Sequence, residues 1–101
     1  MKVLIEPYIS YSSFMTYEID GDSEIITINY IDSSSGEDIL HTDVFDFSEF
    51  PDGVMESVET NIPVNPIVSA ERVDGVLYVT ISKPINDYTP EEDRFPKWIE
   101  V

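Results

Sequence analysis

The sequence predicts one mainly β domain: an antiparallel meander and a β-hairpin, arranged as a small sandwich or a partly open barrel, with one short helix near the C-terminus. Three observations lead to this prediction. Apolar and polar residues alternate along several short runs, which is the period of a half-buried strand. These runs are rich in β-branched and aromatic residues, and groups of Asp, Gly and Ser separate them.

The length and composition fit a single domain that spans residues 1–101. The chain is 42% hydrophobic and contains 12 aromatic residues, which is enough for a small core. Cysteine is absent, which excludes a disulfide scaffold and a thiolate metal site. The apolar run at the N-terminus is too short and too broken for a signal peptide, and no run reaches membrane-spanning length. We therefore expect a soluble, cytoplasmic protein.

Three strands are expected to form the meander. Residues 14–20 alternate apolar with polar side chains, residues 24–32 are rich in Ile and suit a central strand, and residues 38–47 alternate again. Asp20-Gly21-Asp22-Ser23 and the stretch 32–36 have the composition of turns and join these strands.

A hairpin is predicted in the C-terminal half. Residues 67–73 and 76–82 are two β-rich arms, and Asp74-Gly75 between them is a strong signal for a two-residue hairpin turn. Residues 3–9 are expected to supply a further strand. The proline-rich stretch 48–66 is expected to be a surface connection with a turn of helix at 54–59, because prolines remove hydrogen-bond donors from a sheet.

The C-terminal segment has the pattern of a helix start. Thr89 fits the N-cap, Pro90 the first helical position, and Glu92 the position whose side chain bonds back to the cap. Pro96 would end this helix within two turns. The apolar residues that follow are expected to fold back onto the sheet; a contact surface for another subunit is the alternative.

The core candidates are apolar residues of the expected strands. They are Leu4, Tyr17, Ile19, Ile26, Ile28, Tyr30, Val44, Leu77, Val79 and Ile81.

The charge is strongly acidic, with 21 Asp and Glu against 5 Lys and Arg. Between residues 3 and 71 there are 15 carboxylates and no Lys or Arg. Direct binding to nucleic acid or to an anionic membrane is disfavoured, since phosphate contacts need clustered cations. Carboxylates gathered on one side would favour a docking surface, whereas an even spread would favour a role in solubility.

One group of carboxylates has the spacing of the beginning of a calcium loop. Asp20, Asp22 and Glu24 form a D-x-D-x-E pattern, and they are the only metal-binding candidates. Counted from Asp20, however, the sixth position is Ile25 and the twelfth is Ile31, where a calcium loop needs glycine and glutamate. A solvated hairpin turn is the stronger interpretation.

Catalytic groups are not suggested by any pattern. His41 is the only histidine and has no nucleophile at a meaningful spacing. Carboxylate pairs such as Asp43 with Asp46, or Glu91 with Glu92, occur by chance among 21 acidic residues. The four glycines are isolated, so no phosphate-binding loop is present. We expect neither an enzyme nor a cofactor.

The C-terminal third of the chain resembles a group of phage proteins. NPIVSAERVDGVLYVTI followed by TPEEDRFPKWIEV is similar to the end of small uncharacterised proteins encoded in bacteriophage and prophage genomes of Gram-positive bacteria. This resemblance implies a phage context and carries no site residues. In size and charge the chain also resembles small phage-encoded inhibitors of restriction or CRISPR nucleases.

The expected function is that of a non-enzymatic acidic interaction protein, a phage or prophage accessory of the virion or of host takeover, with a protein partner whose surface is basic. A nucleic-acid mimic that inhibits a basic host nuclease is the alternative, and a calcium-dependent binding module is a second one. The expected location is the host cytoplasm, or the virion for a structural protein. The candidate partner-binding residues are Glu18, Asp20, Asp22, Glu24, Glu37, Asp38, Asp43, Asp46 and Trp98.

Overall fold

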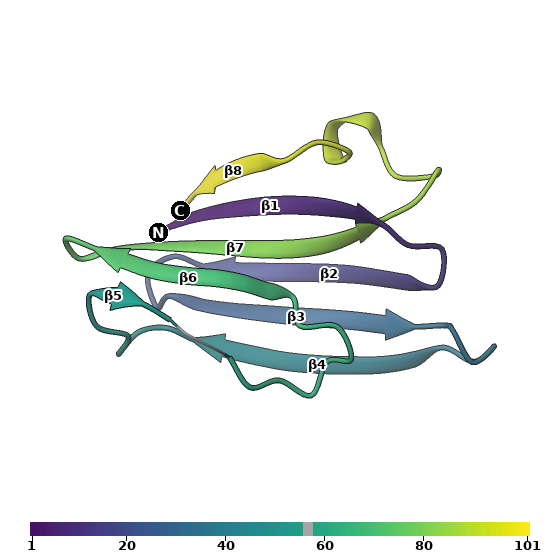
Figure 1. The fold of residues 1–101 in the computed structure, drawn as a ribbon, viewed down its shortest axis with the longest axis horizontal. Helices are drawn as coiled ribbons and strands as arrows, with labels where there is room; N and C mark the ends of the chain where they lie inside the picture. Colours follow the sequence, from purple (N-terminus) through teal and green to yellow (C-terminus); the bar gives the residue numbers. More distant parts are fainter. Residues whose placement is uncertain (56–57) are drawn as a thin grey trace.

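The computed structural model describes residues 1–55 and 58–101, and the chain is mainly β, as predicted (Figure 1). One sheet has five strands in the order β5-β6-β7-β1-β8, and the other has three in the order β2-β3-β4. The strands are β1 (Lys2–Ile9), β2 (Ser13–Asp20), β3 (Ile25–Asp32), β4 (Ile39–Asp46), β5 (Gly53–Val54), β6 (Ile67–Val73), β7 (Val76–Ile85) and β8 (Lys97–Glu100).

The three-stranded sheet is the predicted meander. β2 pairs antiparallel with β3, and β3 pairs antiparallel with β4, so that the Ile-rich strand is central as expected. The register joins Asp20 to Ile25 and Ile25 to Asp46. Antiparallel neighbours need only a short connection, and the two turns that the sequence predicts provide it.

The predicted hairpin is confirmed as β6 and β7 of the five-stranded sheet. Its turn residues Asp74 and Gly75 have φ values of 50° and 81°. A two-residue turn with both φ angles positive matches the right-handed twist of the strands on either side, and Asp-Gly is well suited to it.

The N-terminal strand also forms as predicted, and β1 lies parallel to β7. On its other side it pairs antiparallel with β8. The termini consequently lie together (Figure 1). The Met1 amino group donates to the Val101 carbonyl at 2.9 Å, and the Val101 N–H donates to the Met1 carbonyl at 3.0 Å.

The predicted C-terminal helix is wrong. The described residues contain there only a 3₁₀ turn, η1 (Glu91–Asp93), whose N-cap is Pro90. The Thr89 hydroxyl instead accepts a hydrogen bond from the Asn86 N–H at 2.9 Å, and so it closes the preceding turn. Since β8 begins at Lys97, too few residues remain for a regular α-helix. The tail does fold back onto the sheet as expected, through β8.

The connection between β4 and β6 contains one element that was not predicted. Gly53 and Val54 form β5, which pairs with Arg72 and Glu71 of β6. The helical turn expected at 54–59 is therefore wrong at its first residue, and Glu56 and Ser57 lie outside the described residues. Among the residues that the structure describes, no helix has the length and apolar character that crossing a membrane requires.

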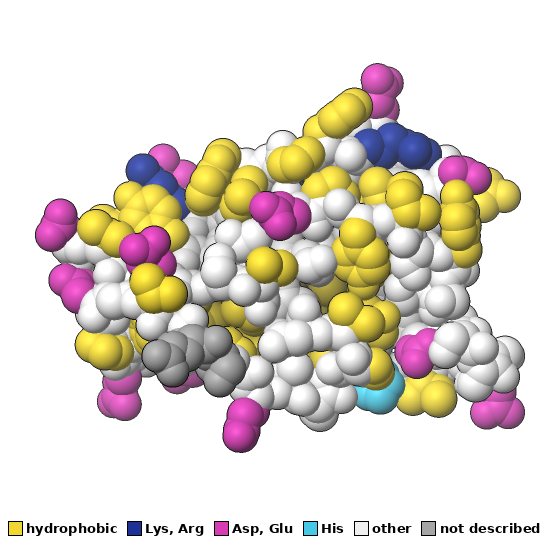
Figure 2. All heavy atoms as spheres, viewed as in Figure 1, with side chains coloured by type: hydrophobic (Ala, Val, Ile, Leu, Met, Phe, Trp, Pro, Cys, Tyr) yellow, Lys and Arg dark blue, Asp and Glu magenta, His cyan; other side chains and the backbone are white. Residues whose placement is uncertain are grey.

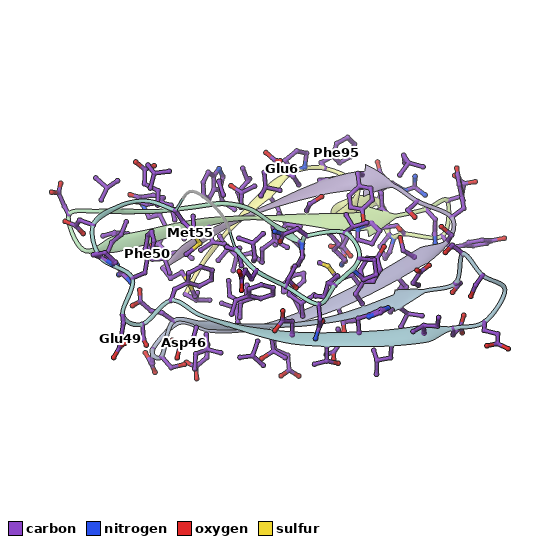
Figure 3. All side chains as sticks on the ribbon, turned by 60° about the horizontal axis from the view of Figure 1, so that its bottom comes forward. Glu6, Asp46, Glu49, Phe50, Met55 and Phe95 are labelled. Carbon is purple, nitrogen blue, oxygen red and sulfur yellow. The ribbon has the colours of Figure 1, made fainter. Side chains whose placement is uncertain are left out.

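One buried cluster takes side chains from both sheets, which lie as two layers with side chains between them (Figure 3). Among the core candidates, Tyr17 and Ile19 pack at its margin, and the buried ones are Ile26, Ile28, Tyr30, Leu77, Val79 and Ile81.

Two core candidates are wrong, because each lies on the face of its strand that points away from the cluster. Leu4 is only half-buried, whereas its neighbours Val3 and Ile5 are buried. Val44 is 55% exposed and Phe45 is 5% exposed, because it is Phe45 that pairs with buried Ile26. A shift of one residue along a strand moves a side chain to the opposite face.

Candidate functional site

The outer face of the three-stranded sheet brings three of the candidate carboxylates together. Met15, buried in β2, fixes the inward face of that strand, so Glu18 and Asp20 point outward. Asp46 of β4 shares a cross-strand row with Asp20 through Ile25. Strands lie about 4.8 Å apart, which places the Cα atoms of Asp20 and Asp46 about 10 Å apart. We call Glu18, Asp20 and Asp46 the acidic end.

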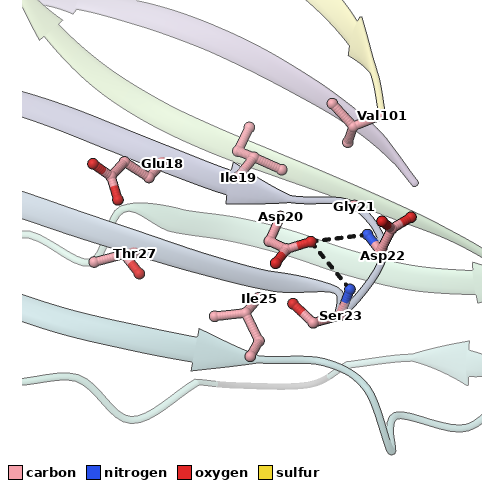
Figure 4. Close-up of a pocket in the computed structure, with 9 residues that line it drawn as sticks. All are labelled: Glu18, Ile19, Asp20, Gly21, Asp22, Ser23, Ile25, Thr27 and Val101. Atoms are coloured by element: carbon pink, nitrogen blue, oxygen red, sulfur yellow. Dashed lines mark hydrogen bonds between the residues drawn. The ribbon is translucent and has the colours of Figure 1, made fainter.

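The turn between β2 and β3 is the solvated turn that the sequence predicts. Asp20 Oδ1 accepts hydrogen bonds from the N–H groups of Asp22, at 3.1 Å, and Ser23, at 3.3 Å (Figure 4). The bond from the Ser23 backbone is the largest cause that lowers the pKa of Asp20, because it stabilises the ionised carboxylate. Asp20 is therefore an anion that also holds the turn.

The last residues of β3 and β4 repeat this arrangement. Asp32 Oδ1 accepts the Ser34 N–H at 2.9 Å, and Asp46 Oδ1 accepts the Ser48 N–H at 2.9 Å. The hydroxyl and the N–H of Ser34 lower the pKa of Asp32, and those of Ser48 lower the pKa of Asp46. An Asp that closes a strand and binds the backbone two residues later is a common turn device.

An open hollow lies at the acidic end, beside the β2–β3 turn (Figure 4). Its lining comes from both strands, from the turn and from the C-terminus: Glu18, Ile19, Asp20, Gly21, Asp22, Ser23, Ile25, Thr27 and Val101. A Cβ atom on Gly21 would lie 2.7 Å from the Val101 carbonyl carbon, which is closer than real contacts allow. Gly21 therefore permits the C-terminal residue to lie against the turn.

Glu24 does not share this hollow, although it follows Asp22 closely in the sequence. Its backbone φ is 57°, and its carboxylate binds Arg72 at two points, Nη1 to Oε2 and Nη2 to Oε1, both 3.0 Å. The three calcium candidates therefore do not converge. Within residues 1–55 and 58–101, no group of three or more Asp, Glu or His side chains could hold a metal ion.

The sequence analysis did not identify the role of Arg72. This role is structural. Besides Glu24, it donates to the carbonyls of Phe50 at 2.6 Å, Phe47 at 2.9 Å and Gly75 at 3.0 Å, so five hydrogen bonds match its five donors. The hydrogen bond with Glu24 is the main cause that raises its pKa. The hairpin register could have indicated this role, because Arg72 pairs with Leu77, which is buried, and paired residues point to the same side of a sheet.

Asp43 is also used by the fold. Its Oδ2 accepts the Thr60 hydroxyl at 2.7 Å, and its Oδ1 accepts the Val44 N–H at 2.8 Å. The bond from Thr60 fastens the β4–β6 connection to the edge of the sheet, and the bond from Val44 lies within β4. Asp43 shares the inward side of β4 with Phe45, whereas Asp46 points outward, so these two carboxylates do not form a pair. His41 lies on the inward side too, with its ring centroid 6.5 Å from that of Tyr30.

The remaining candidates lie elsewhere. Glu37 and Asp38 belong to the β3–β4 turn, at the opposite end of the sheet, where Asp38 accepts the Ser33 hydroxyl at 2.6 Å. Trp98 is 62% exposed on β8 of the other sheet, beside a small apolar groove where Lys2 Nζ lies 5.7 Å from the Tyr78 ring centroid. Asp and Glu side chains are accordingly scattered over the face in Figure 2.

Three of the nine candidates, Glu18, Asp20 and Asp46, form one outward group. The others are the turn residues Asp22, Glu37 and Asp38, then Glu24 and Asp43, which bind other parts of the fold, and Trp98 on the other sheet. No protein-family model, no curated protein and no solved structure matches this chain. Its function is therefore inferred from the geometry of its own surface.

Proposed function

We propose that this protein is a non-enzymatic interaction protein that binds the basic surface of a protein partner through its acidic end. The observation that carries this proposal is that Glu18, Asp20 and Asp46 share one exposed sheet face. Among the described residues, the salt bridges use Glu24 and Asp93 instead, with Arg72 and Lys97 as their partners. The acidic end therefore presents uncompensated charge, which favours fast and specific association with Lys and Arg.

The contacts of the side chains that could act in catalysis support a non-enzymatic function. Asp43 binds Thr60 and its own strand, and Glu24 binds Arg72. His41 lies against Tyr30 on the inward side of the sheet. Each of these groups is occupied by contacts that hold the fold together.

A phage or prophage accessory role, in the host cytoplasm or in the virion, remains part of the proposal. Its support is the resemblance of the C-terminal third, which folds as β6, β7, η1 and β8. We also propose that the two sheets form a sandwich, because one buried cluster contains residues of both. The genes next to this one test the phage role: tail genes or inhibitor genes would support it, and a purely metabolic neighbourhood would contradict it.

A nucleic-acid mimic is the weaker proposal. A mimic needs carboxylates gathered in one extended array, whereas the exposed carboxylates also lie on the outer face of the other sheet. Glu71, Lys2 and Glu100 share a cross-strand row there, and Glu6 lies on the same side of β1. Such a spread serves solubility and not mimicry, so the proposed contact is limited to the three carboxylates of the acidic end.

A charge-matched comparison tests the proposed function. The first variant combines Glu18→Gln, Asp20→Asn and Asp46→Asn, in which each Asn keeps the oxygen that accepts the turn hydrogen bond. The control variant combines Glu6→Gln, Glu71→Gln and Glu100→Gln, which removes the same charge from the other sheet. The measurement is the Kd for a lysine-rich peptide, by calorimetry at low and raised salt.

The first variant is expected to weaken binding about tenfold, since three charge contacts of roughly 0.5 kcal/mol each correspond to that factor. The control variant is expected to change the Kd much less, and raised salt is expected to weaken wild-type binding. Equal losses in the two variants would mean that only net charge matters and would contradict the proposal.

A further inference from the structure

The outer face of the three-stranded sheet changes character along its length. Its register defines four cross-strand rows, and the side chains of each row point the same way. The rows are Asp20–Ile25–Asp46, Glu18–Thr27–Val44, Thr16–Asn29–Thr42 and Phe14–Ile31–Leu40. The face therefore runs from carboxylates, through hydroxyl and amide groups, to large apolar side chains.

The last row is a contiguous apolar patch, which we call the apolar end: Phe14, Ile31 and Leu40. Phe14 is 58% exposed and Leu40 is 62% exposed, and Ile31 lies half-buried between them. Single exposed apolar residues are ordinary, but a row that crosses a whole sheet is a feature of interaction surfaces.

The middle of the face is polar, and two of its side chains bind each other. The Thr42 hydroxyl donates to Asn29 Oδ1 at 2.8 Å. Thr16 and Thr42 are exposed, so the two ends are joined by a surface that a partner can cross without burying charge. Phe14 and Asp20 are six residues apart on β2, and at about 3.4 Å per residue the two ends lie about 20 Å apart.

We propose that this whole face is a docking surface for a protein segment that carries basic side chains at one end and large apolar side chains about 20 Å away. The inference rests on the proposed function and deepens it, because it adds the apolar end and a fixed spacing. Charge complementarity at the acidic end orients the segment, and burial of apolar area at the other end adds affinity.

A second copy of the chain does not fit this face. Two copies stacked in one orientation would place the acidic ends against each other, in a protein of net charge −16. Stacked in the opposite orientation, each apolar end would desolvate the carboxylates of the other copy. Nucleic acid and anionic membranes are repelled by the acidic end. A basic and amphipathic protein segment satisfies both ends at once.

Three synthetic peptides test the spacing. The spaced peptide has two Lys residues, a spacer of five Ser and Thr residues, and then Phe-Leu, so that in an extended chain the nearer Lys lies six residues, about 20 Å, from Phe. The compact peptide has the same composition with Lys next to Phe-Leu, and the lysine-only peptide replaces Phe-Leu by Ser-Ser. The spaced peptide is expected to bind about tenfold more tightly than either of the others, because only it buries apolar area while its charges are paired.

A variant of the apolar end tests the location. Phe14→Thr with Leu40→Thr removes the patch and keeps residues that favour strands. It is expected to abolish the advantage of the spaced peptide and to leave the Kd of the lysine-only peptide unchanged. The control, Phe95→Thr with Trp98→Thr, removes exposed aromatic side chains that do not adjoin Phe14 and is expected to retain the advantage. Thermal unfolding of both variants checks that the fold is intact.

The inference is overturned if the spaced and compact peptides bind equally, or if the Phe14→Thr, Leu40→Thr variant keeps the advantage. It is overturned also if sedimentation shows wild-type dimers that this variant loses, since the face would then serve a second copy. A different result would contradict the proposed function: the lysine-only peptide would bind the variant with neutralised Glu18, Asp20 and Asp46 as tightly as it binds the wild type.

Discussion

Glu24 and Arg72, which are 48 residues apart in the sequence, form a two-point ion pair that joins the β2–β3 turn to β6. The pair thereby connects the three-stranded sheet to the five-stranded sheet. The side chains are 22% and 11% exposed, and the other donors of Arg72 bind the carbonyls of Phe47, Phe50 and Gly75. One side chain therefore holds four segments of the chain together.

Arg72→Ala is expected to lower the free energy of unfolding by about 2–4 kcal/mol, because it leaves Glu24 and several carbonyls without their partner. Arg72→Lys is expected to recover only part of this loss, since an ammonium group cannot reproduce the planar fork. The measurement is urea unfolding followed by fluorescence. The matched control is Arg94→Ala, which removes bonds to the carbonyls of Thr89 and Asp87 in a peripheral loop. An Arg72→Ala cost no larger than that of the control would contradict this role.

The two faces of β4 are expected to differ sharply in their tolerance of substitution. Phe45→Ala removes a buried ring and should destabilise the protein by about 3–5 kcal/mol. Val44→Thr should change stability by less than about 0.5 kcal/mol, because Val44 points to solvent in a strand that suits Thr. Chemical denaturation of the two variants measures the contrast, and a larger cost at Val44 would mean that the inward face of β4 is assigned wrongly.

The β6–β7 turn is expected to depend on Gly75. Its φ of 81° lies in the left-handed region, so Gly75→Ala should cost about 1–3 kcal/mol of strain. Asp74→Asn is the control: φ at residue 74 is 50°, and Asn accepts this conformation as readily as Asp. Thermal unfolding that showed equal midpoints for wild type and Gly75→Ala would argue against this turn geometry.

Acid is expected to remove stability that three turn carboxylates supply. Hydrogen bonds lower the pKa of Asp20, Asp32 and Asp46 below the ordinary value of 3.8. A group whose pKa is lower in the folded state stabilises the fold above its unfolded pKa, and this contribution is lost as the pH falls through the folded pKa. The unfolding midpoint of the wild type should therefore fall more steeply below pH 3.8 than that of a variant that combines Asp20→Asn, Asp32→Asn and Asp46→Asn. Parallel curves would contradict the prediction.

Local patterns in the sequence were sufficient for the meander and for the hairpin, because strand period and turn composition are properties of adjacent residues. They were not sufficient for the pairing of β1 with β7, which depends on residues far apart in the chain. The face of β4 was ambiguous for a related reason: Val44 and Phe45 are adjacent and both apolar, so alternation alone does not choose between them. The short helix failed because its cap residue, Thr89, closes another turn.

The sequence predicted which residue types form the candidate site, but it did not predict which of the candidates lie together on one sheet face. Sequence reasoning named Glu18, Asp20 and Asp46 as three of nine equal candidates, and only the strand register places these three on one face. It also treated Glu24 as a surface carboxylate, because its partner Arg72 lies far away in the sequence. The apolar end was missed, since Phe14 and Leu40 become neighbours of Ile31 only through cross-strand pairing.

The central claim is that the acidic end, and not the net charge alone, recognises a basic partner. The most direct test is an NMR titration of the isotope-labelled protein with the lysine-only peptide, with chemical shifts followed residue by residue. The claim predicts the largest shift changes at Glu18, Asp20, Thr27 and Asp46. Equal changes at Glu71 and Glu100 of the other sheet, or small changes spread over all carboxylates, would contradict it.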